Sequence, residues 1–286
     1  MIARSGKLFA VAVLVAASLT AGCTWDSPPV EWQAPSPIAA GVDTAAHYVA
    51  RWMPGATPDV AVARGETSDR AAAEARLAAP PAACASSWVS AAPARGSVWS
   101  AWWQVRPDSS ASLLSEQRDT GGAVLQRVVV DSVDMALLGC ARPAPSIAVD
   151  SVNGYVHIGY YMVAPEGPGL FYAHLMNVQL HQFERPIAIV YGEKPVRVAV
   201  ASNADTVVVA YEDPNSEMGR IALSMSLTGG HLFEQTARLI PVSTSSQQAS
   251  APQIVRLAGA QLWIGWTEDS QSGSAFLLRR ARIVAR

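Results

Sequence analysis

From about residue 84 to the end of the sequence, short apolar runs alternate with breaks. The runs are rich in Val, Ile, Ala and aromatic residues, and Gly, Pro, Asn and Asp stand between them. Such runs, bounded by turn-forming residues, are typical of consecutive β-strands. They do not alternate cleanly between apolar and polar positions, which indicates strands covered on both faces of a sheet. We therefore predict an all-β domain over residues 84–286.

The strand pattern repeats along this domain. Each copy opens near a proline, passes a turn and closes on an aromatic residue, and the clearest copies begin at Pro145, Pro195 and Pro252. The closing aromatic residues recur with a period of about 55 residues: Trp102, Tyr160, Tyr211 and Trp266. Two Thr-Gly-Gly triplets, at Thr120 and Thr228, are separated by two such periods. A repeat of this length has room for four strands and predicts an array of similar units.

The second triplet lies in the segment Ser226-Leu-Thr-Gly-Gly-His-Leu-Phe233. This segment resembles the Asp box, Ser-x-Asp-x-Gly-x-Thr-Trp/Phe, of sialidase-like propellers. It keeps Ser226, Gly230 and Phe233, and it departs at Thr228, where the motif has Asp, and at Leu232, where it has Thr. The resemblance implies a turn between the third and fourth strands of a propeller blade, which is a four-stranded sheet.

We therefore predict a β-propeller-like domain of four to five four-stranded blades, with a β-sandwich as the alternative. In the second repeat the strands are expected near 145–149, 155–162, 169–176 and 185–191. The last repeat offers only three strands, near 253–257, 261–267 and 275–283. Its fourth strand must come from elsewhere, because an unpaired edge would otherwise be exposed. We expect a strand within 46–63 to fill this place. The rest of segment 46–83 holds either a short helix or disordered chain.

The N-terminus has the pattern of a secretory leader. Arg4 and Lys7 precede an apolar run over 8–19, and Thr20-Ala-Gly-Cys23 follows. The run is shorter than the roughly 20 residues that a spanning helix needs. The segment resembles the lipobox of bacterial lipoproteins, although Thr20 replaces the usual Leu, Val or Ile. The resemblance implies a signal peptide over 1–22 and acylation of Cys23, palmitate included; an ordinary signal peptide or an anchor helix is the alternative.

A lipid on Cys23 would place the protein outside the cytoplasm, with the membrane as its first partner. Thr24 rather than Asp follows the cysteine, and by resemblance to Gram-negative lipoproteins this implies the outer membrane. Residues 23–45 are proline-rich (Pro28, Pro29, Pro35 and Pro37) and predict an extended tether.

Composition narrows the classes further. The chain has 286 residues, of which 50% are hydrophobic and 15% charged, too apolar for a disordered protein. Its net charge is -2 and no basic block occurs, so we exclude nucleic acid as a partner. With Cys23 acylated, Cys84 and Cys140 remain. They stand one repeat apart, at equivalent places in two repeats, and predict a disulfide, with two buried free thiols as the alternative.

In a propeller, the loops from second to third strand and from fourth to first strand share one rim. Acidic residues fall in two of these loops: Glu212, Asp213, Glu217, Glu268 and Asp269. Carboxylates that converge there could hold Ca²⁺ through oxygen ligands or bind a cationic partner. The alternative is that they are simply solvated.

The sialidase resemblance also implies three arginines and a tyrosine nucleophile with a glutamate. Arg142, Arg185 and Arg197 lie near repeat boundaries and Tyr160 and Tyr211 are available, yet no arginine has the Arg-Ile-Pro context of that family.

Aromatic and histidine residues offer weaker pointers. His157 and His174 are placed to face each other across neighbouring strands, but structural histidines are the simpler interpretation and we assign no metal ligands. Trp99, Trp102 and Trp103 cluster on one strand, as a core or as a platform for sugars.

From the sequence we therefore expect an envelope lipoprotein whose propeller-like domain binds a protein or glycan partner without catalysis and without a cofactor. The alternatives are a sialidase-like glycoside hydrolase and a purely structural envelope component.

Overall fold

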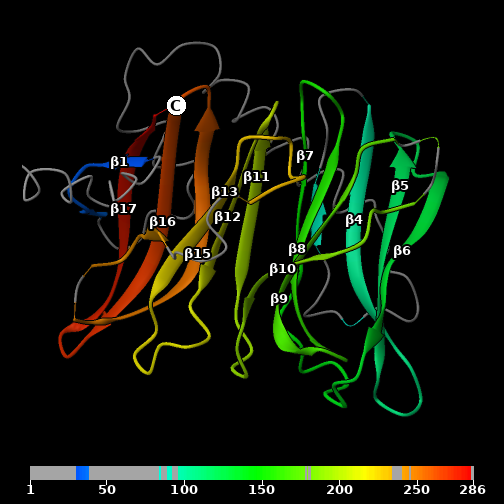
Figure 1. Cartoon of the computed structure of the whole chain (residues 1–286), viewed down its shortest axis with the longest axis horizontal. Helices are drawn as coiled ribbons and strands as arrows, with labels where there is room; N and C mark the ends of the chain where they lie inside the picture. Colours follow the sequence, from blue (N-terminus) through cyan, green and yellow to red (C-terminus); the bar gives the residue numbers. More distant parts are fainter. Residues whose placement is uncertain are drawn as a thin grey trace, which may run out of the picture.

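The computed structural model describes residues 30–38, 84, 89–91, 96–177, 179, 182–233, 240–244 and 246–284. These residues form strands and turns, in four antiparallel sheets, as the all-β prediction required (Figure 1). In the part of the chain described, no helix has the length and hydrophobicity to cross a bilayer.

Three of the sheets are meanders of four strands in chain order, and the last has three such strands with a segment from the N-terminal part of the chain at its edge. The first contains β3 (Val89–Ala91), β4 (Ser97–Val105), β5 (Ala111–Asp119) and β6 (Val124–Asp134). The second contains β7 (Ser146–Val149), β8 (Val156–Ala164), β9 (Gly167–Leu175) and β10 (Ile187–Tyr191). The third contains β11 (Val198–Asn203), β12 (Thr206–Glu212), β13 (Ile221–Ser226) and β14 (Ile240–Pro241). The last contains β15 (Gln248–Ala258), β16 (Gln261–Ser270) and β17 (Gly273–Ile283).

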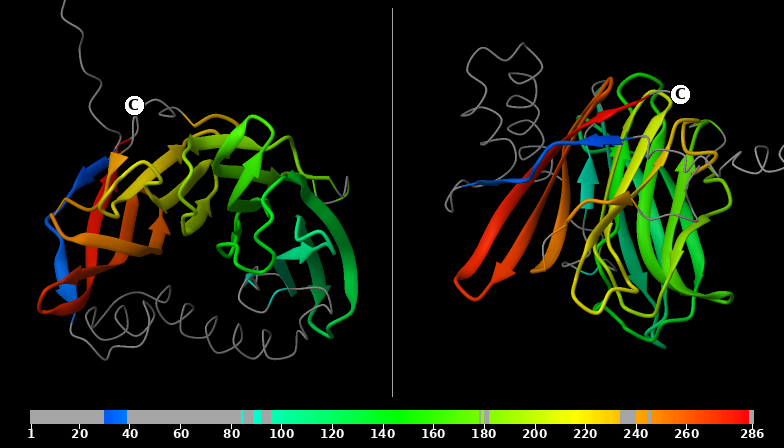
Figure 2. Two further views of the ribbon diagram at one scale, coloured as in Figure 1. Left: turned by 90° about the horizontal axis from the view of Figure 1, so that it is seen from below. Right: turned by 60° about the vertical axis from the view of Figure 1, so that its left-hand side comes forward.

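The four sheets follow one another around an arc, with the first and last sheets at its two ends (Figure 2). The first strands of successive sheets are neighbours: β3 contacts β7, β7 contacts β11, and β11 contacts β15. This radial order of meander sheets is that of propeller blades and not that of a two-sheet sandwich. Four blades are described. The segment 46–83 lies outside the described residues, together with the strand and helix expected in it.

The outer strand of the last blade comes from the N-terminal part of the chain, but from a different segment than expected. β1 (Val30–Trp32) and β2 (Ser36–Ile38) pair antiparallel with β17. The prolines predict an extended, flexible tether over 23–45, but residues 30–38 pair with a strand of the last blade, so the prediction is wrong for them. An edge strand tolerates proline, since its outer side has no ladder bond to lose. Val30 is buried in the core and pairs with Ile283.

The closing aromatic residues of the repeats form the core of the blades. Each lies on the second strand of its sheet and is at most 1% exposed: Trp102, Tyr160, Tyr211 and Trp266. Trp99 and Trp103 are also buried on β4, so this strand offers no exposed platform for sugars. Large rings at equivalent places explain why the repeat is visible in the sequence: each blade must fill the same space against its neighbour.

Cys84 and Cys140 form the predicted disulfide, with their Cα atoms 5.4 Å apart. One precedes β3 and the other precedes β7, so the bond joins the entries to the first two blades.

The Asp-box-like segment makes the turn after β13, between the third and fourth strands of its blade, as the resemblance implied. The Ser226 hydroxyl accepts the N–H of Gly230 at 3.0 Å, and Thr228 Oγ1 accepts the N–H of Leu232 at 3.1 Å. Thr228 stands where the motif has Asp, and its hydroxyl oxygen accepts this backbone N–H in place of a carboxylate. Phe233 packs edge-on against Tyr172 of the second blade, with ring centroids 4.8 Å apart.

Candidate functional site

A pocket of about 840 Å³ opens on the rim where the first strands begin. Its walls come from three consecutive blades: residues 141–146 before β7, 194–199 at the start of β11, and 248–253 in β15. Three of its lining residues are the prolines that open the repeats: Pro145, Pro195 and Pro252. Equivalent segments of neighbouring blades therefore converge here, on the rim predicted to bind ligands.

Two cationic side chains are exposed at this pocket, those of Lys194 and Arg197. The lining also includes one carboxylate, Glu212 at the end of β12. Its Oε2 accepts the N–H of Arg197 at 3.1 Å and its Oε1 accepts the N–H of Ala251 at 2.9 Å. Glu212 thus links the segment before the first strand of the third blade to the first strand of the fourth blade.

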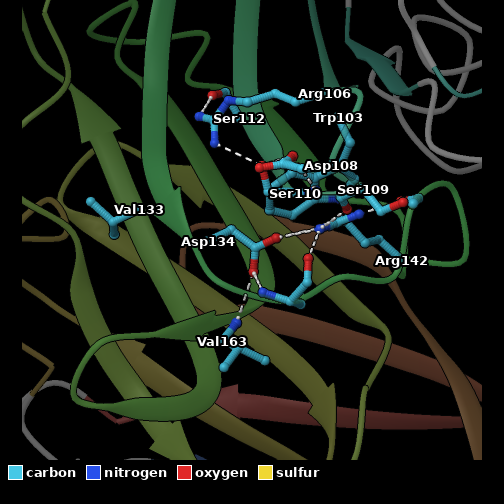
Figure 3. Close-up of polar contacts among 12 residues, drawn as sticks. Trp103, Arg106, Asp108, Ser109, Ser110, Ser112, Val133, Asp134, Arg142 and Val163 are labelled. Atoms are coloured by element: carbon cyan, nitrogen blue, oxygen red, sulfur yellow. Dashed lines mark hydrogen bonds and ion pairs between the residues drawn. The ribbon is translucent and has the colours of Figure 1, made fainter.

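Arg142 also lines the pocket, but its guanidinium is committed to the protein. It forms an ion pair with Asp134 at 2.6 Å, in which both side chains are 2% exposed. It also donates to the carbonyl oxygens of Ser109, Ala136 and Gly139 (Figure 3). The other Asp134 oxygen accepts the N–H of Val163 on β8 at 3.0 Å. This network ties the first blade to the second and leaves Arg142 no free donor face for a ligand.

The structure does not assemble the arginine and tyrosine set that the sialidase resemblance implied. Arg185 lies in the connection between β9 and β10 and is not part of the pocket. Tyr160 is fully buried and donates to Asp131 Oδ2 at 2.7 Å. Burial raises the pKa of Tyr211 to about 12, so its phenol stays protonated. Both tyrosines are core residues.

The predicted rim carboxylates lie at one end of two blades but do not gather. Asp213 and Glu217 are in the loop after β12, whereas Glu212 ends β12, and Glu268 and Asp269 are near the end of β16 and not in a loop. Asp213 accepts the N–H of Asn215 at 3.0 Å, inside its own turn. Glu268 accepts the indole N–H of Trp266 at 3.3 Å, and Asp269 bonds the hydroxyl of Ser274.

Asp108, in the equivalent loop of the first blade, shows the same local role. Its side chain accepts the hydroxyl and the N–H of Ser110, and these bonds lower its pKa. Among the described residues, no three of Glu212, Asp213, Glu217, Glu268 and Asp269 offer ligand atoms within 4.8 Å of one another. The geometry therefore gives no support to a calcium site at these five residues.

Lys194 is the pocket residue that sequence reasoning missed. It is one of two lysines in the chain and directly precedes the repeat-opening Pro195. The repeat alignment carried this signal, because it placed the segments before the first strands at one end of the blades.

His157 and His174 do face each other, as Cα partners on β8 and β9. His157 Nδ1 lies 2.6 Å from the hydroxyl of Tyr172, and burial lowers the pKa of His157 to about 3. The one group of described residues with metal-ligand geometry is instead His174 with Glu184 and His231.

The sequence matches no known family and no curated protein. Among solved structures, the chain is similar to a protein of unknown function from Dyadobacter fermentans, with 14% identity and a TM-score of 0.48. That match covers 68% of this chain and 52% of the other, so this chain spans about half of that protein's length. An endo-arabinase from Bacteroides thetaiotaomicron matches with 12% identity and a TM-score of 0.41, over 70% of this chain and 75% of its own. An arabinanase from Bacillus subtilis matches with 12% identity and a TM-score of 0.39, over 65% and 69%. The propeller assignment itself stands on the strand order and the repeat.

Proposed function

We propose that this protein is an envelope lipoprotein whose propeller binds a protein or glycan partner in the pocket on the first-strand rim, without catalysis. The composition of the pocket carries the proposal. Lys194 and Arg197 present two cationic groups between apolar proline walls, and neither side chain has a polar partner among the described residues, whereas Glu212 is already engaged by two backbone N–H groups. Such a site can hold an anionic group, and the one carboxylate in its described lining is already engaged.

The positive charge of the pocket indicates the chemical class of the group that binds there. Two cations within one concave surface favour a carboxylate or a similar anion, as carried by an acidic sugar or by Asp and Glu side chains of a protein.

Glycoside hydrolysis, the first alternative, has less support from this geometry. In most families it requires two carboxyl groups on either side of the scissile bond. In the described part of the chain, Glu212 is the one carboxylate in the pocket lining, and no tyrosine is part of that lining.

A purely structural role, the second alternative, has one observation in its favour. The outer strand of the first blade and the segment after it expose a row of apolar side chains: Val124, Leu125, Val129, Val133, Met135 and Leu137. An apolar row of this kind marks a surface for contact with another macromolecule. This apolar row and the pocket are separate surfaces, so they can bind different partners.

The pocket is tested by site-specific photo-crosslinking in native membranes. A photoreactive residue replaces Gln253, which is exposed in the pocket lining, or Val152, which is 62% exposed in the turn between β7 and β8. We expect one specific adduct from position 253 that is absent from position 152. The double variant Lys194→Glu/Arg197→Glu should lower its yield at least about tenfold, because charge-assisted bonds contribute about 1.5–3 kcal/mol each.

Identical adducts from both positions, or an adduct that the charge reversal leaves unchanged, would refute binding in the pocket. Release of sugar from the captured glycan by the purified protein would favour the hydrolase instead.

The anchor is the second part of the proposal. β1 begins at Val30, a short distance along the chain from Cys23, and even fully extended this stretch spans at most about 25 Å. Lipid on Cys23 would therefore hold the last blade close to the membrane surface, and Thr24 favours the outer membrane. Cys23→Ala should abolish palmitate labelling, because it removes the thiol that carries the lipid. A parent chain that takes up no palmitate would instead indicate an ordinary signal peptide or an anchor helix.

A further inference from the structure

Three potential metal ligands meet at the rim opposite the pocket. His174 is near the end of β9, Glu184 lies in the connection from β9 to β10, and His231 lies in the Asp-box-like turn after β13. The Asp-box-like turn is bonded to the turn between β11 and β12: the N–H of Gly229 in the first donates to the carbonyl oxygen of Asp205 in the second at 2.7 Å. Since Glu212 ends β12 at the pocket, the cluster lies at the far end of the blades.

The ligand atoms of the cluster are close to one another. Glu184 Oε2 is 3.4 Å from His174 Nε2 and 3.9 Å from His231 Nδ1, and the three side chains offer ligand atoms within 4.8 Å of one another. The two imidazole rings are perpendicular, with centroids 5.1 Å apart. In a tetrahedral site with bonds of about 2.0–2.1 Å, ligand atoms lie about 3.3 Å apart, so a small closing movement is enough.

His174 supplies an independent observation. Its side chain is 3% exposed, yet among the residues that the structure describes its Nε2 has no hydrogen-bond partner. A buried polar atom without such a bond is costly, and a bound ion is one way to offset that cost. This nitrogen lies 3.4 Å from Glu184 Oε2, so it points into the cluster. Glu184 and His231 are about half exposed, which leaves an entry path for an ion from solvent.

We propose that His174, Glu184 and His231 bind one divalent transition-metal ion of the Zn²⁺ class, with water as the fourth ligand. Two imidazoles and one carboxylate suit zinc and its neighbours, whereas Ca²⁺ and Mg²⁺ prefer sets of oxygen ligands. Two of the ligands belong to the second blade and one to the third. The ion would join these blades at the rim opposite the partner-binding pocket.

The test uses the whole chain without a polyhistidine tag, purified in detergent and stripped with EDTA. Zn²⁺ titration by calorimetry, together with metal analysis after dialysis, should give one ion per chain. Glu184→Gln and His231→Ala should each weaken Zn²⁺ binding at least about tenfold. The matched control is Glu166→Gln, an exposed carboxylate next to the opposite end of β9, which should bind like the parent.

A thermal readout separates ligation from misfolding. Without metal, Glu184→Gln and His231→Ala should melt close to the parent, because both side chains are half exposed. Zn²⁺ should raise the Tm of the parent and of Glu166→Gln but not of the two ligand variants. Co²⁺ should give the parent a visible absorption band that both ligand variants lack.

The proposal fails if the parent binds no Zn²⁺, or if all three variants bind it as the parent does. The pocket variant Lys194→Glu/Arg197→Glu should keep the site, so this test and the crosslinking test fail separately.

Discussion

At the scale of single residues, the clearest consequence concerns Arg142. Its ion pair with Asp134 is fully buried, and its guanidinium lies 5.8 Å from the ring centre of Trp103. Arg142→Met leaves the Asp134 charge buried without its partner, which typically costs about 3–5 kcal/mol, so we expect a fall of about that size in the free energy of unfolding. Urea unfolding measures it.

The control is Arg282→Met on β17, where the side chain is exposed and a change within about 0.5 kcal/mol is expected. Arg142→Met/Asp134→Leu should lose less than Arg142→Met alone, because it removes both charges. If the single variant were as stable as the Arg282 control, the pair would not be buried as described.

Sequence reasoning located the segments of the site better than its residues. Arg142 and Arg197 both line the pocket. Arg142 forms a buried ion pair with Asp134, whereas the Arg197 side chain has no polar partner among the described residues. The different fates of the two arginines depend on the contact between Arg142 and Asp134, and the spacing of these residues in the sequence does not predict it. The same holds for the rim acids: Asp213 bonds within its own turn, whereas Glu212 bonds backbone N–H groups of two blades.

At the scale of elements, the Asp-box-like turn is the feature to test. Gly229 and Gly230 both have positive φ, at 69° and 96°. A Cβ on Gly229 meets nothing within 4 Å, whereas a Cβ on Gly230 would lie 2.0 Å from the Tyr172 hydroxyl oxygen. Gly229→Ala should therefore cost only its backbone strain, about 1–2 kcal/mol. Gly230→Ala should cost about 1–3 kcal/mol more, since a buried ring must also move.

Thermal and urea unfolding of the two alanine variants would show this ordering. Equal losses would mean that the turn and the second blade are not packed together as described.

The Pro-rich segment shows where an element could not be predicted. Its prolines suggested extended chain off the membrane, and the local conformation is indeed extended. Whether such chain is free or paired depends on an available edge, and that edge, β17, lies near the other end of the chain. Local propensity therefore described the backbone of residues 30–38 but not their partner.

At the scale of the whole molecule, the disulfide joins two cysteines with a sequence separation of 56 and closes a loop across the first blade. On the chain-entropy model such a bond stabilises by about 4 kcal/mol. Cys84→Ser/Cys140→Ser should lose stability of that order, as should the parent under a reductant. Denaturant unfolding under oxidising and reducing conditions measures both. Cys23→Ser, which leaves the bond intact, is the control. An unfolding midpoint insensitive to reductant would contradict a constraint between the blades.

The sequence by itself determined the strands, their grouping in fours, the disulfide and the equivalence of the loops that form the pocket. It could do so because every blade must fill the same space against its neighbours, so one pattern of turns and large rings recurs along the chain. Only the tertiary structure decided which charges remain free, which segment completes the last blade, and that His174 and His231 meet. These depend on contacts between blades, where residues of different repeats become neighbours and no local pattern records the pairing.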